Sequence, residues 1–482
     1  MGDRKKSKIF NDPVHGHVEM HELCVKIIDT PQFQRLRYIK QLGGCYFVYP
    51  GAAHNRFEHS IGTAHLAGVL AESLKSRQEG LGITDKDVLC VKIAGLCHDL
   101  GHGPFSHLFD RSFIPKVAEG ADKDWRHEKA SLAMVKLIFD NLKKEDPKNF
   151  GLEKGDIKFI EELIDGQTEG SDEDDQYKER KRRKVSFFRL FPTRIVVLTF
   201  DHMRCIKMAR VIKDDDNKWH ICFRDKEVHN IYEMFHVRSI LHRRAYQHKT
   251  SNAVELMITD ALVKADPYLE FEGKDGKKLM SEAIHDMVAY TKITDQVYHQ
   301  ILHASDQQLD EARKILERIE RRELYRSIEE HTTEKDISRI DVDKGTLEIA
   351  NKSGVAKEDI ILDKVKFDYG MKEKDPVKNV YFYKKEDPDK PIKIEEDKVS
   401  YMLPKVFLEW KIRLYLRKTE LDEVKTKQLI KGFGEWFKKV KDVKEESAAG
   451  SSGAAGREDE TPEKKRSPEE HDGAPAKKKL EY

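Results

Sequence analysis

Three histidines and one aspartate, His98, Asp99, His102 and His107, lie close together in HDLGHGPFSH, directly after the apolar run VLCVKIAGLC. His59 lies upstream in NRFEHSIGTAHLAG, whose apolar residues recur at helical spacing. Neutral imidazole nitrogen and carboxylate oxygen suit a divalent transition ion, and a His, His, Asp set leaves positions open for water and substrate. A lone histidine is more often a hydrogen-bonded core residue, but this clustering favours a catalytic metal site.

These residues resemble the opening of the HD superfamily of metal-dependent phosphohydrolases. Longer segments resemble, in order, the SAM-and-HD-domain family of deoxynucleoside triphosphate (dNTP) triphosphohydrolases: NDPVHGH, DTPQFQRLRYIKQLGG, PGAAHNRFEHSIGTAHLAG, AGLCHDLGHGPFSH, RDKEV, MFHVRSILHRRAYQHK and DYGM. The similarity covers most of residues 8–165 and 200–412. It implies that water attacks the α-phosphorus of a dNTP and that nucleoside and inorganic triphosphate leave. It also implies a role in lowering dNTP supply and restricting viruses.

The resemblance assigns the chemistry residue by residue. His107 and His127 are expected to be the acid and the phosphate-contacting histidines, because imidazole holds or gives a proton near neutral pH. Asp110 would orient His107 if that segment is helical, and a surface carboxylate is the equal alternative. Mg is expected with the triphosphates. The expected ligands of a divalent transition metal (Zn, Fe or Mn) are His59, His98 and Asp99.

A second group of residues is expected to contact the substrate. Arg238, His242 and Tyr246 are spaced so that a continuous helix would present them on one face, although spacing alone favours an ordinary solvated face. An apolar Leu42 packed where a ribose hydroxyl would lie favours deoxynucleotides, because a buried unpaired hydroxyl is costly. The positions that match substrate contacts are Gln41, Leu42, Arg56, His102, Arg238, Tyr246 and Gln247.

The resemblance further implies activation by GTP and a dNTP that bind between the subunits of a homotetramer. Asp29 suits the N–H groups of guanine, and Lys8 with Arg37 would supply charge for phosphate. For any single basic residue a solvated surface role is the simpler alternative. The guanine-nucleotide positions are Lys8, Ile9, Asp29, Gln34 and Arg37. The second effector positions are Asn11, Val48, Tyr49, Arg204, Arg224, Lys226, Asn230, Arg244, His248 and Lys249.

The chain departs from the family pattern over residues 166–199, where the family carries its last metal-binding aspartate and a substrate-facing tyrosine. Asp165 or Asp201 is the candidate replacement, and Asp201 is weak because it matches a different family aspartate. The basic run KERKRRK indicates a nuclear-import or nucleic-acid patch, or equally a solvated loop that balances SDEDD. This segment belongs either to an alternative or mis-spliced product or to an active enzyme with a substituted ligand.

Two functions therefore remain open. The first is a metal-dependent dNTP triphosphohydrolase regulated by nucleotides through oligomerisation. The second is a catalytically impaired isoform that acts as a nucleotide-sensing or single-stranded nucleic-acid-binding scaffold, since losing a metal ligand usually costs more than a change around it. An HD phosphodiesterase acting on cyclic nucleotides or oligonucleotides is disfavoured, because Gln41, Leu42 and Tyr246 match a mononucleotide pocket.

The apolar patterns of the segments that must position these residues, together with the resemblance, predict a mainly α fold. It consists of an HD-domain helical core with a smaller α+β C-terminal lobe. Helices are expected throughout residues 9–165, including PQFQRLRYIKQL, and they continue over residues 225–265. Short alternating runs, TLEIA, VKNVYFYKK and KPIKIEE, predict strands. The expected parts are a disordered lead (1–7) with no SAM domain, the core (8–336, with 166–199 atypical), the lobe (337–444) and a disordered tail (445–482).

Composition adds limits. The 88 basic and 87 acidic residues leave a net charge of +1, so any anion site must be local. The six cysteines form no CxxC pair, which favours reduced thiols and a nuclear or cytoplasmic location. No apolar run approaches the ~20 residues of a membrane span, so no membrane partner is expected.

Overall fold

The computed structural model describes residues 7–147, 150–165, 201–371, 374–399 and 404–442. The described chain is mainly helical with four small sheets, so the predicted fold class is confirmed. The described residues up to Lys441 cluster into one compact unit. The predicted lead, apart from Ser7, the segment 166–199 with its KERKRRK run, and the tail lie outside the described residues. No described helix is long and apolar enough to cross a bilayer.

Two helices carry the predicted metal ligands, and they pack against each other: α3 (Arg56–Arg77) and α4 (Asp85–Cys97). Asn55 N–H donates to the Glu58 carboxylate at 2.6 Å, which fixes the start of α3. A reciprocal capping box between Thr84 and Asp87 starts α4. The first turn of α3 therefore lies beside the end of α4.

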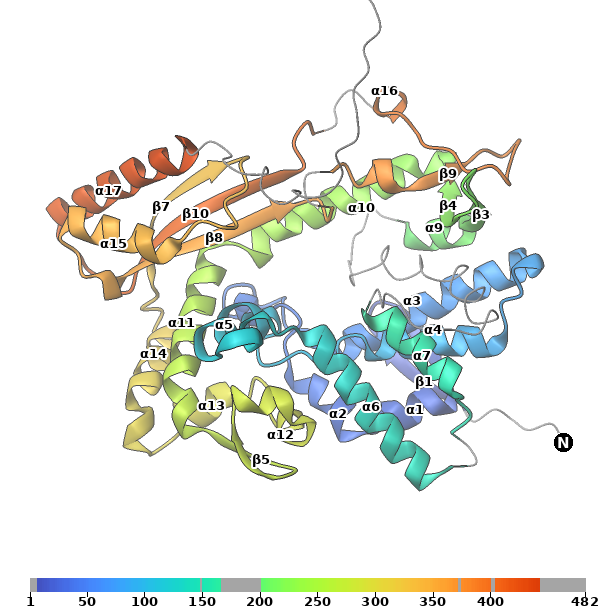
Figure 1. Cartoon of the computed structure of the whole chain (residues 1–482), viewed down its shortest axis with the longest axis horizontal. Coiled ribbons are helices and arrows are strands. Elements are labelled where there is room, and N and C mark those ends of the chain that lie inside the picture. Colours follow the sequence, from blue (N-terminus) through green and yellow to red (C-terminus); the bar gives the residue numbers. More distant parts are fainter. Residues whose placement is uncertain (1–6, 148–149, 166–200, 372–373, 400–403, 443–482) are drawn as a thin grey trace, which may run out of the picture. The chain divides into compact units, whose positions relative to one another are not determined.

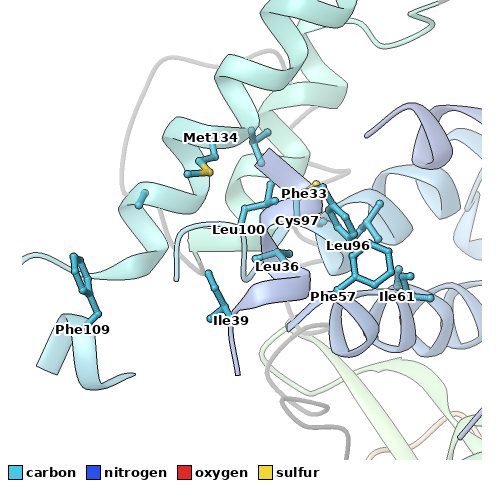
Figure 2. Packing of buried hydrophobic residues seen from close by; sticks show 14 of the residues in the cluster. Phe33, Leu36, Ile39, Phe57, Ile61, Leu96, Cys97, Leu100, Phe109 and Met134 are labelled. Carbon is cyan, nitrogen blue, oxygen red and sulfur yellow. The ribbon is translucent and has the colours of Figure 1, made fainter. Parts of the chain in front are cut away.

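The packing of buried side chains around these helices is shown in Figure 2. Phe33 and Leu36 are fully buried, and the Phe33 ring lies edge-on to Phe57 with centroids 5.4 Å apart. Leu96 on α4 and Met134 are also completely buried. Removing one of these side chains would cost about 2–5 kcal/mol, so this core sets the geometry of the site above it.

Trp125 closes the same core from the opposite side. Its ring contacts Phe109 and Tyr290, with centroid distances of 5.9 and 5.8 Å. Tyr290 is fully buried, and its hydroxyl donates to the Gly101 carbonyl at 2.9 Å. This aromatic group therefore anchors the loop that follows α4.

The other elements are shown in Figure 1. The helices are α1 (Glu22–Ile28), α2 (Pro31–Gln34), α5 (Ile114–Val117), α6 (His127–Glu145), α7 (Lys154–Asp165), α9 (His202–Met208), α10 (Val228–Leu241), α11 (Lys249–Ala265), α12 (Met287–Thr291), α13 (Val297–Leu302), α14 (Asp310–Glu320), α15 (Val342–Ser353), α16 (Glu396–Val399) and α17 (Glu423–Asp442). The strands are β1 (Lys8–Asp12), β2 (Gly16–Met20), β3 (Arg210–Lys213), β4 (Trp219–Arg224), β5 (Glu270–Gly273), β6 (Gly276–Leu279), β7 (Arg326–Thr333), β8 (Ile360–Asp368), β9 (Tyr381–Tyr383) and β10 (Leu408–Leu416).

Two helical predictions near the N-terminus are wrong. Residues 8–20 form an antiparallel hairpin of β1 and β2, because Asp12 accepts the N–H groups of Val14 and His15 and Gly16 supplies a left-handed turn residue at φ 69°. The segment PQFQRLRYIKQL is not one helix. It divides into α2 and a 3-10 turn, Arg35–Tyr38, whose Arg35 side chain is buried.

Helices are present over residues 225–265, as predicted, with a π turn between them. After a 3-10 turn, α10 ends at Leu241, residues 242–246 form one turn of π-helix, and α11 begins at Lys249 with His248 Nδ1 accepting from Thr250 N–H at 3.2 Å. The wider π turn shifts the positions of Arg238, His242 and Tyr246 relative to a regular helical face. The three residues nevertheless remain neighbours, as described below.

The C-terminal part contains its own core, formed by the antiparallel sheet β7-β10-β8 together with α15 and α17. The run TLEIA lies in helix α15, so its prediction as a strand is wrong. Tyr381–Tyr383 forms β9, but this strand pairs in parallel with β4. KPIKIEE contributes only an isolated bridge between Ile392 and Phe382. Local alternation does not distinguish an amphipathic helix flank from a strand in such short runs.

Candidate metal and phosphate site

The predicted metal ligands converge. His59 lies in the first turn of α3, while His98 caps the C-terminal end of α4 and Asp99 follows it. His59 Nε2 is 3.2 Å from Asp99 Oδ2, and His98 Nε2 is 3.3 Å from Asp99 Oδ1. One ligand atom from each residue lies within 4.8 Å of the others. The sequence therefore brings two nitrogens and one carboxylate to a single point.

The donor set fits a divalent transition ion. His98 Nδ1 lies 2.9 Å from the Gly95 carbonyl, which can only accept, so the lone pair is left on Nε2, the atom that faces Asp99. The other His59 nitrogen, Nδ1, is buried and has no hydrogen-bond partner among the described residues. Desolvation by burial, with smaller effects from His98 and Arg56, lowers the pKa of His59 below its usual value. A neutral imidazole is the form that binds metal.

Arg56 connects this cluster to the surrounding loops. Its guanidinium is 3% exposed and donates to Asp99 Oδ2 at 2.6 Å and to Ser106 Oγ at 2.9 Å. A longer bond, 3.4 Å, runs to the Gln41 carbonyl. Burial opposes ionisation of Asp99, but Arg56, then His98 and His102, hold its pKa well below the usual range. The site therefore contains a fixed cation beside a permanent carboxylate.

A second histidine group lies next to the first. His102, His107 and His127 each place a ring nitrogen within 4.8 Å of the others, and the His102 and His127 rings stack with centroids 3.6 Å apart. His102 Nε2 is 3.3 Å from Asp99 Oδ1, which joins the two groups. Asp110 lies beneath, with Oδ2 2.8 Å from His127 Nδ1 and Oδ1 3.4 Å from His107 Nδ1.

Asp110 fixes how these histidines can act. Burial opposes its ionisation, but its contacts with His107 and His127 hold its pKa well below the usual range. An ionised carboxylate only accepts hydrogen bonds, so the His127 Nδ1 carries a hydrogen and its Nε2 is left for another partner, while the His107 Nδ1 makes a longer contact of 3.4 Å. The sequence paired Asp110 with His107 alone. The structure adds His127, and it places Asp110 in a π-helical turn rather than an α-helix.

The predicted substrate residues on α10 and the π turn lie near one another, and His242 lies near the second histidine group. The His242 and Tyr246 rings lie 4.9 Å apart. Burial, followed by the charge of Arg238, lowers the pKa of His242 to about 4, and His107 is among the groups that act on it. Gln247 follows, with Oε1 buried and unpaired among the described residues. Leu42 and Gln41 lie in the segment whose carbonyl Arg56 contacts.

The predicted guanine-nucleotide residues occupy two local groups. Gln34 Nε2 donates to the Ile28 carbonyl at 2.7 Å, and Arg37 Nε donates to Gln34 Oε1 at 2.8 Å. Asp29 caps the C-terminal end of α1 next to Ile28. Lys8 and the 65% exposed Ile9 lie on β1.

The second effector set also divides. Tyr49 Oη donates to the Arg244 carbonyl at 2.6 Å and its ring lies 6.0 Å from that of His248. Arg204 and Asn230 both contact Glu227 at the other end of α10. By position, the group around Tyr49 also includes Val48 and Lys249. The group around Glu227 also includes Arg224 and Lys226, whereas Asn11 lies on β1. The 14 residues of α10, about 21 Å of helix, separate the two groups.

Neither candidate replacement ligand joins the metal cluster. Asp201 Oδ1 accepts the Arg204 N–H at 2.8 Å, and its backbone pairs with the Asn230 side chain. Asp165 is the exposed last residue of α7. Among the described residues the cluster consists of His59, His98 and Asp99, while residues 166–199 lie outside the description.

Sequence reasoning missed the residues that hold the loops. Arg35 donates to the carbonyls of Leu100, His102 and Ile293 at 2.7–2.9 Å. Asp295 accepts from the backbone of Phe105 and Lys40. Both residues are remote from the motif in sequence, and nothing local distinguishes them from surface charges.

Comparisons with known proteins follow this geometry. The HD domain family matches residues 56–185. A chicken protein named deoxynucleoside triphosphate triphosphohydrolase SAMHD1 is 48% identical over 447 residues, covering 86% of this chain and 72% of its own. The chain belongs to the SAMHD1 family. The human SAMHD1 protein is 46% identical, with 86% and 71% of the two chains covered, and a Dictyostelium discoideum SAMHD1 homolog is 36% identical, with 88% and 80% covered.

Membership of the SAMHD1 family confirms the predicted resemblance. It also makes the chain a metal-dependent phosphohydrolase of the HD type by family. The roles of the individual site residues, the identity of the metal and the effectors remain predictions. The structure contributes the arrangement of the residues on which those predictions depend.

Proposed function

We propose that the chain hydrolyses dNTPs, releasing nucleoside and inorganic triphosphate, in a cleft between the metal cluster and the second histidine group. The observation that carries this proposal is the junction of the two groups at Asp99, which contacts His59, His98, His102 and Arg56. The printed name of the SAMHD1 relatives supports the substrate class.

The residues divide the work as follows. His59, His98 and Asp99 would hold a divalent ion, which supplies positive charge that polarises a phosphoryl oxygen. Arg56 contributes a second fixed positive charge beside it. His127 and His107, held at Nδ1 by Asp110, direct Nε2 toward the phosphate chain, where either can accept or return a proton. Mg would accompany the triphosphate itself.

Regulation by GTP and a dNTP through a homotetramer is part of the proposal. The separation of the second effector group along α10 supports it, because one nucleotide cannot contact both ends of a helix about 21 Å long. A nucleotide that uses both halves needs two copies of the chain. GTP added to purified protein should therefore raise the oligomeric mass in analytical ultracentrifugation, and a mass independent of GTP and dNTP would contradict this part.

The decisive experiment measures triphosphate release from dGTP with GTP and Mg present, together with bound metal. His98→Ala should abolish turnover and lower the metal content, because it removes one of three described ligands. His303→Ala, at an exposed histidine after α13, is the matched control and should keep both. Metal-free wild-type protein without turnover would contradict the enzymatic proposal.

A second function is favoured by the three-residue metal cluster, which lacks a described carboxylate from a later helix. Under this alternative the chain is a catalytically impaired isoform that senses nucleotides or binds single-stranded nucleic acid. Contacts to nucleic-acid phosphates release counterions, so such binding weakens as salt is added. A fluorescent oligonucleotide whose affinity falls steeply between roughly 50 and 200 mM salt, without any hydrolysis, would support this alternative.

A further inference from the structure

The histidine loop is held in an unusual backbone conformation. Phe105 and Ser106, the two residues before His107, have φ values of 56° and 60°, in the left-handed region that non-glycine residues rarely adopt. Both residues are at least 96% buried. Consecutive residues in this region cost about 1–3 kcal/mol each, so the surrounding contacts must hold them.

Asp295 supplies the central contact. Its Oδ1 accepts the Phe105 N–H at 2.6 Å, and its Oδ2 accepts the Lys40 N–H at 2.8 Å. Ser106 Oγ donates to the Lys40 carbonyl at 2.5 Å and accepts from Arg56 Nε at 2.9 Å. Both backbone groups of Lys40 are therefore hydrogen-bonded: its N–H donates to Asp295, and its carbonyl accepts from Ser106 in the histidine loop.

The two segments joined in this way carry different parts of the proposed site. Lys40 directly precedes Gln41 and Leu42, the candidate contacts to the deoxyribose. Ser106 directly precedes His107, a candidate contact to the phosphates. Asp295 itself comes from the turn before α13, and its own N–H donates to the Tyr38 carbonyl at 3.0 Å. It thus connects three parts of the chain that are far apart in sequence.

We propose that Asp295 is a positioning residue that ties the sugar segment, residues 40–42, to the histidine loop, residues 105–107, and so sets the spacing between the sugar and phosphate contacts for one substrate. This inference rests on the proposed function. The inference is supported by the backbone N–H groups of both segments, which donate to the same carboxylate. A positioning role predicts that a change at Asp295 alters both segments at once, whereas simple local packing predicts a change in one.

The charge of this carboxylate matters because an ionised group accepts hydrogen bonds on both oxygens more strongly than a neutral acid does. Desolvation raises the pKa of Asp295 to about 7, against the lowering effects of the Phe105 and Lys40 N–H groups and of the Lys40 and Arg35 charges. Protonation removes the charge and places a hydrogen on one oxygen, so the hydrogen bonds from the Phe105 and Lys40 N–H groups weaken. Turnover is therefore expected to fall as pH falls through about 7.

Stability should change in the opposite direction. The pKa of Asp295 is higher in the folded than in the unfolded chain, so its contribution is fully present below about pH 4 and decreases as pH rises toward 7. As pH rises toward 7, turnover should therefore increase while the free energy of unfolding decreases. These opposite changes are expected of a carboxylate that must be ionised to position the two segments.

The test compares Asp295→Asn and Asp295→Glu with Asp306→Asn. Asp306 is an exposed carboxylate that accepts the Gln308 N–H, so it matches the chemistry away from the site. Hydrogen exchange is measured on peptides covering residues 38–42 and 103–108, and kcat for dGTP is measured from pH 6 to 8.5 with the metal content.

Asp295→Asn should raise exchange in both peptides together, lower kcat on the order of 100-fold with metal retained, and flatten the kcat profile near pH 7. Asp295→Glu should restore part of kcat, and Asp306→Asn should behave as wild type. If Asp295→Asn speeds exchange in only one of the peptides, or in neither, the inference is overturned. It is also overturned if kcat of Asp295→Asn still falls below pH 7 as it does in wild type. Exchange requires no turnover, so inactive wild-type protein would defeat the proposed function while leaving this test intact.

Discussion

At the scale of single residues, the main feature of the site is the sharing of Asp110 by two histidines. One carboxylate contacts the Nδ1 atoms of His107 and His127, which come from a loop and from the start of α6. Such a carboxylate beneath an imidazole fixes its tautomer and its orientation. The two histidines should therefore lose function together when it is altered.

Asp110→Asn should lower kcat for dGTP about 10- to 100-fold, because the amide cannot accept from both histidines with the strength of a charged group. Metal content should remain, since Asp110 is not among His59, His98 and Asp99. Asp140→Asn, at an exposed position on α6, provides the control. Steady-state kinetics with metal analysis would check this, and wild-type kcat in Asp110→Asn would contradict the role.

The sequence predicts this residue scale unevenly. His59, His98 and Asp99 were predicted together and do lie together, because a short motif at a helix end and a helical first turn constrain their placement strongly. Asp110 was paired only with His107. Its contact with His127 depends on how α6 packs, which no local pattern records. Arg35 and Asp295 were not predicted, because their partners are backbone atoms remote in sequence.

At the scale of elements, the close approach of α6 to the loop after α4 controls the site. Gly101 lies in this contact: a Cβ there would be 2.1 Å from the His127 carbonyl and 2.3 Å from the Ser131 N–H nitrogen. The Gly101 N–H also donates to Ser131 Oγ at 2.9 Å. Only glycine at position 101 allows the start of α6 to lie this close to the loop that follows α4.

Gly101→Ala should therefore lower the free energy of unfolding by about 3 kcal/mol, since the clashing atoms are backbone and cannot rotate away. Gly80→Ala is the matched control, because nothing lies within 4 Å of its added Cβ, and its effect should stay within about 1 kcal/mol. Urea titrations of both variants would test this. A Gly101→Ala protein as stable as wild type would show that α6 can move.

Helices α3, α4 and α6 were predictable from the sequence, because α3 and α6 combine buried apolar with exposed polar residues and α4 is a largely apolar segment that is buried on most sides. The β1–β2 hairpin and the helix over TLEIA were not. Both segments are short, so a few turn contacts and tertiary packing decide their conformation instead of periodicity. The π turn at residues 242–246 is likewise a product of packing, which sequence spacing alone does not reveal.

At the scale of the whole molecule, the C-terminal sheet is tied to the candidate site through β10. Arg413 is 4% exposed, donates to the Gln247 carbonyl at 2.8 Å and pairs with Glu330 at 2.6 Å. Tyr415 Oη donates to the Lys249 carbonyl at 2.9 Å. The central strand of the lobe therefore touches the segment that joins the π turn to α11.

Arg413→Ala should lower the free energy of unfolding by about 1.5–3 kcal/mol, because it removes charged hydrogen bonds to Gln247 and Glu330. It should also raise KM for dGTP, since Gln247 is a candidate substrate contact. Arg321→Ala is the control: its salt bridges to Glu317 and Glu323 are exposed, and their loss should cost under about 1 kcal/mol. Unchanged stability and KM in Arg413→Ala would rule out this link.

The placement of Trp125 gives the protein an internal optical reporter. Its indole is 6% exposed, packs on Phe109 and Tyr290, and lies two residues before His127. Trp410 and Trp436 belong to the separate core of the C-terminal lobe, and Trp219 lies on β4. Replacing the last three with phenylalanine would leave the emission of Trp125 alone, beside Phe109 and two residues before His127, so nucleotide binding near His127 could be timed in stopped-flow fluorescence without a label.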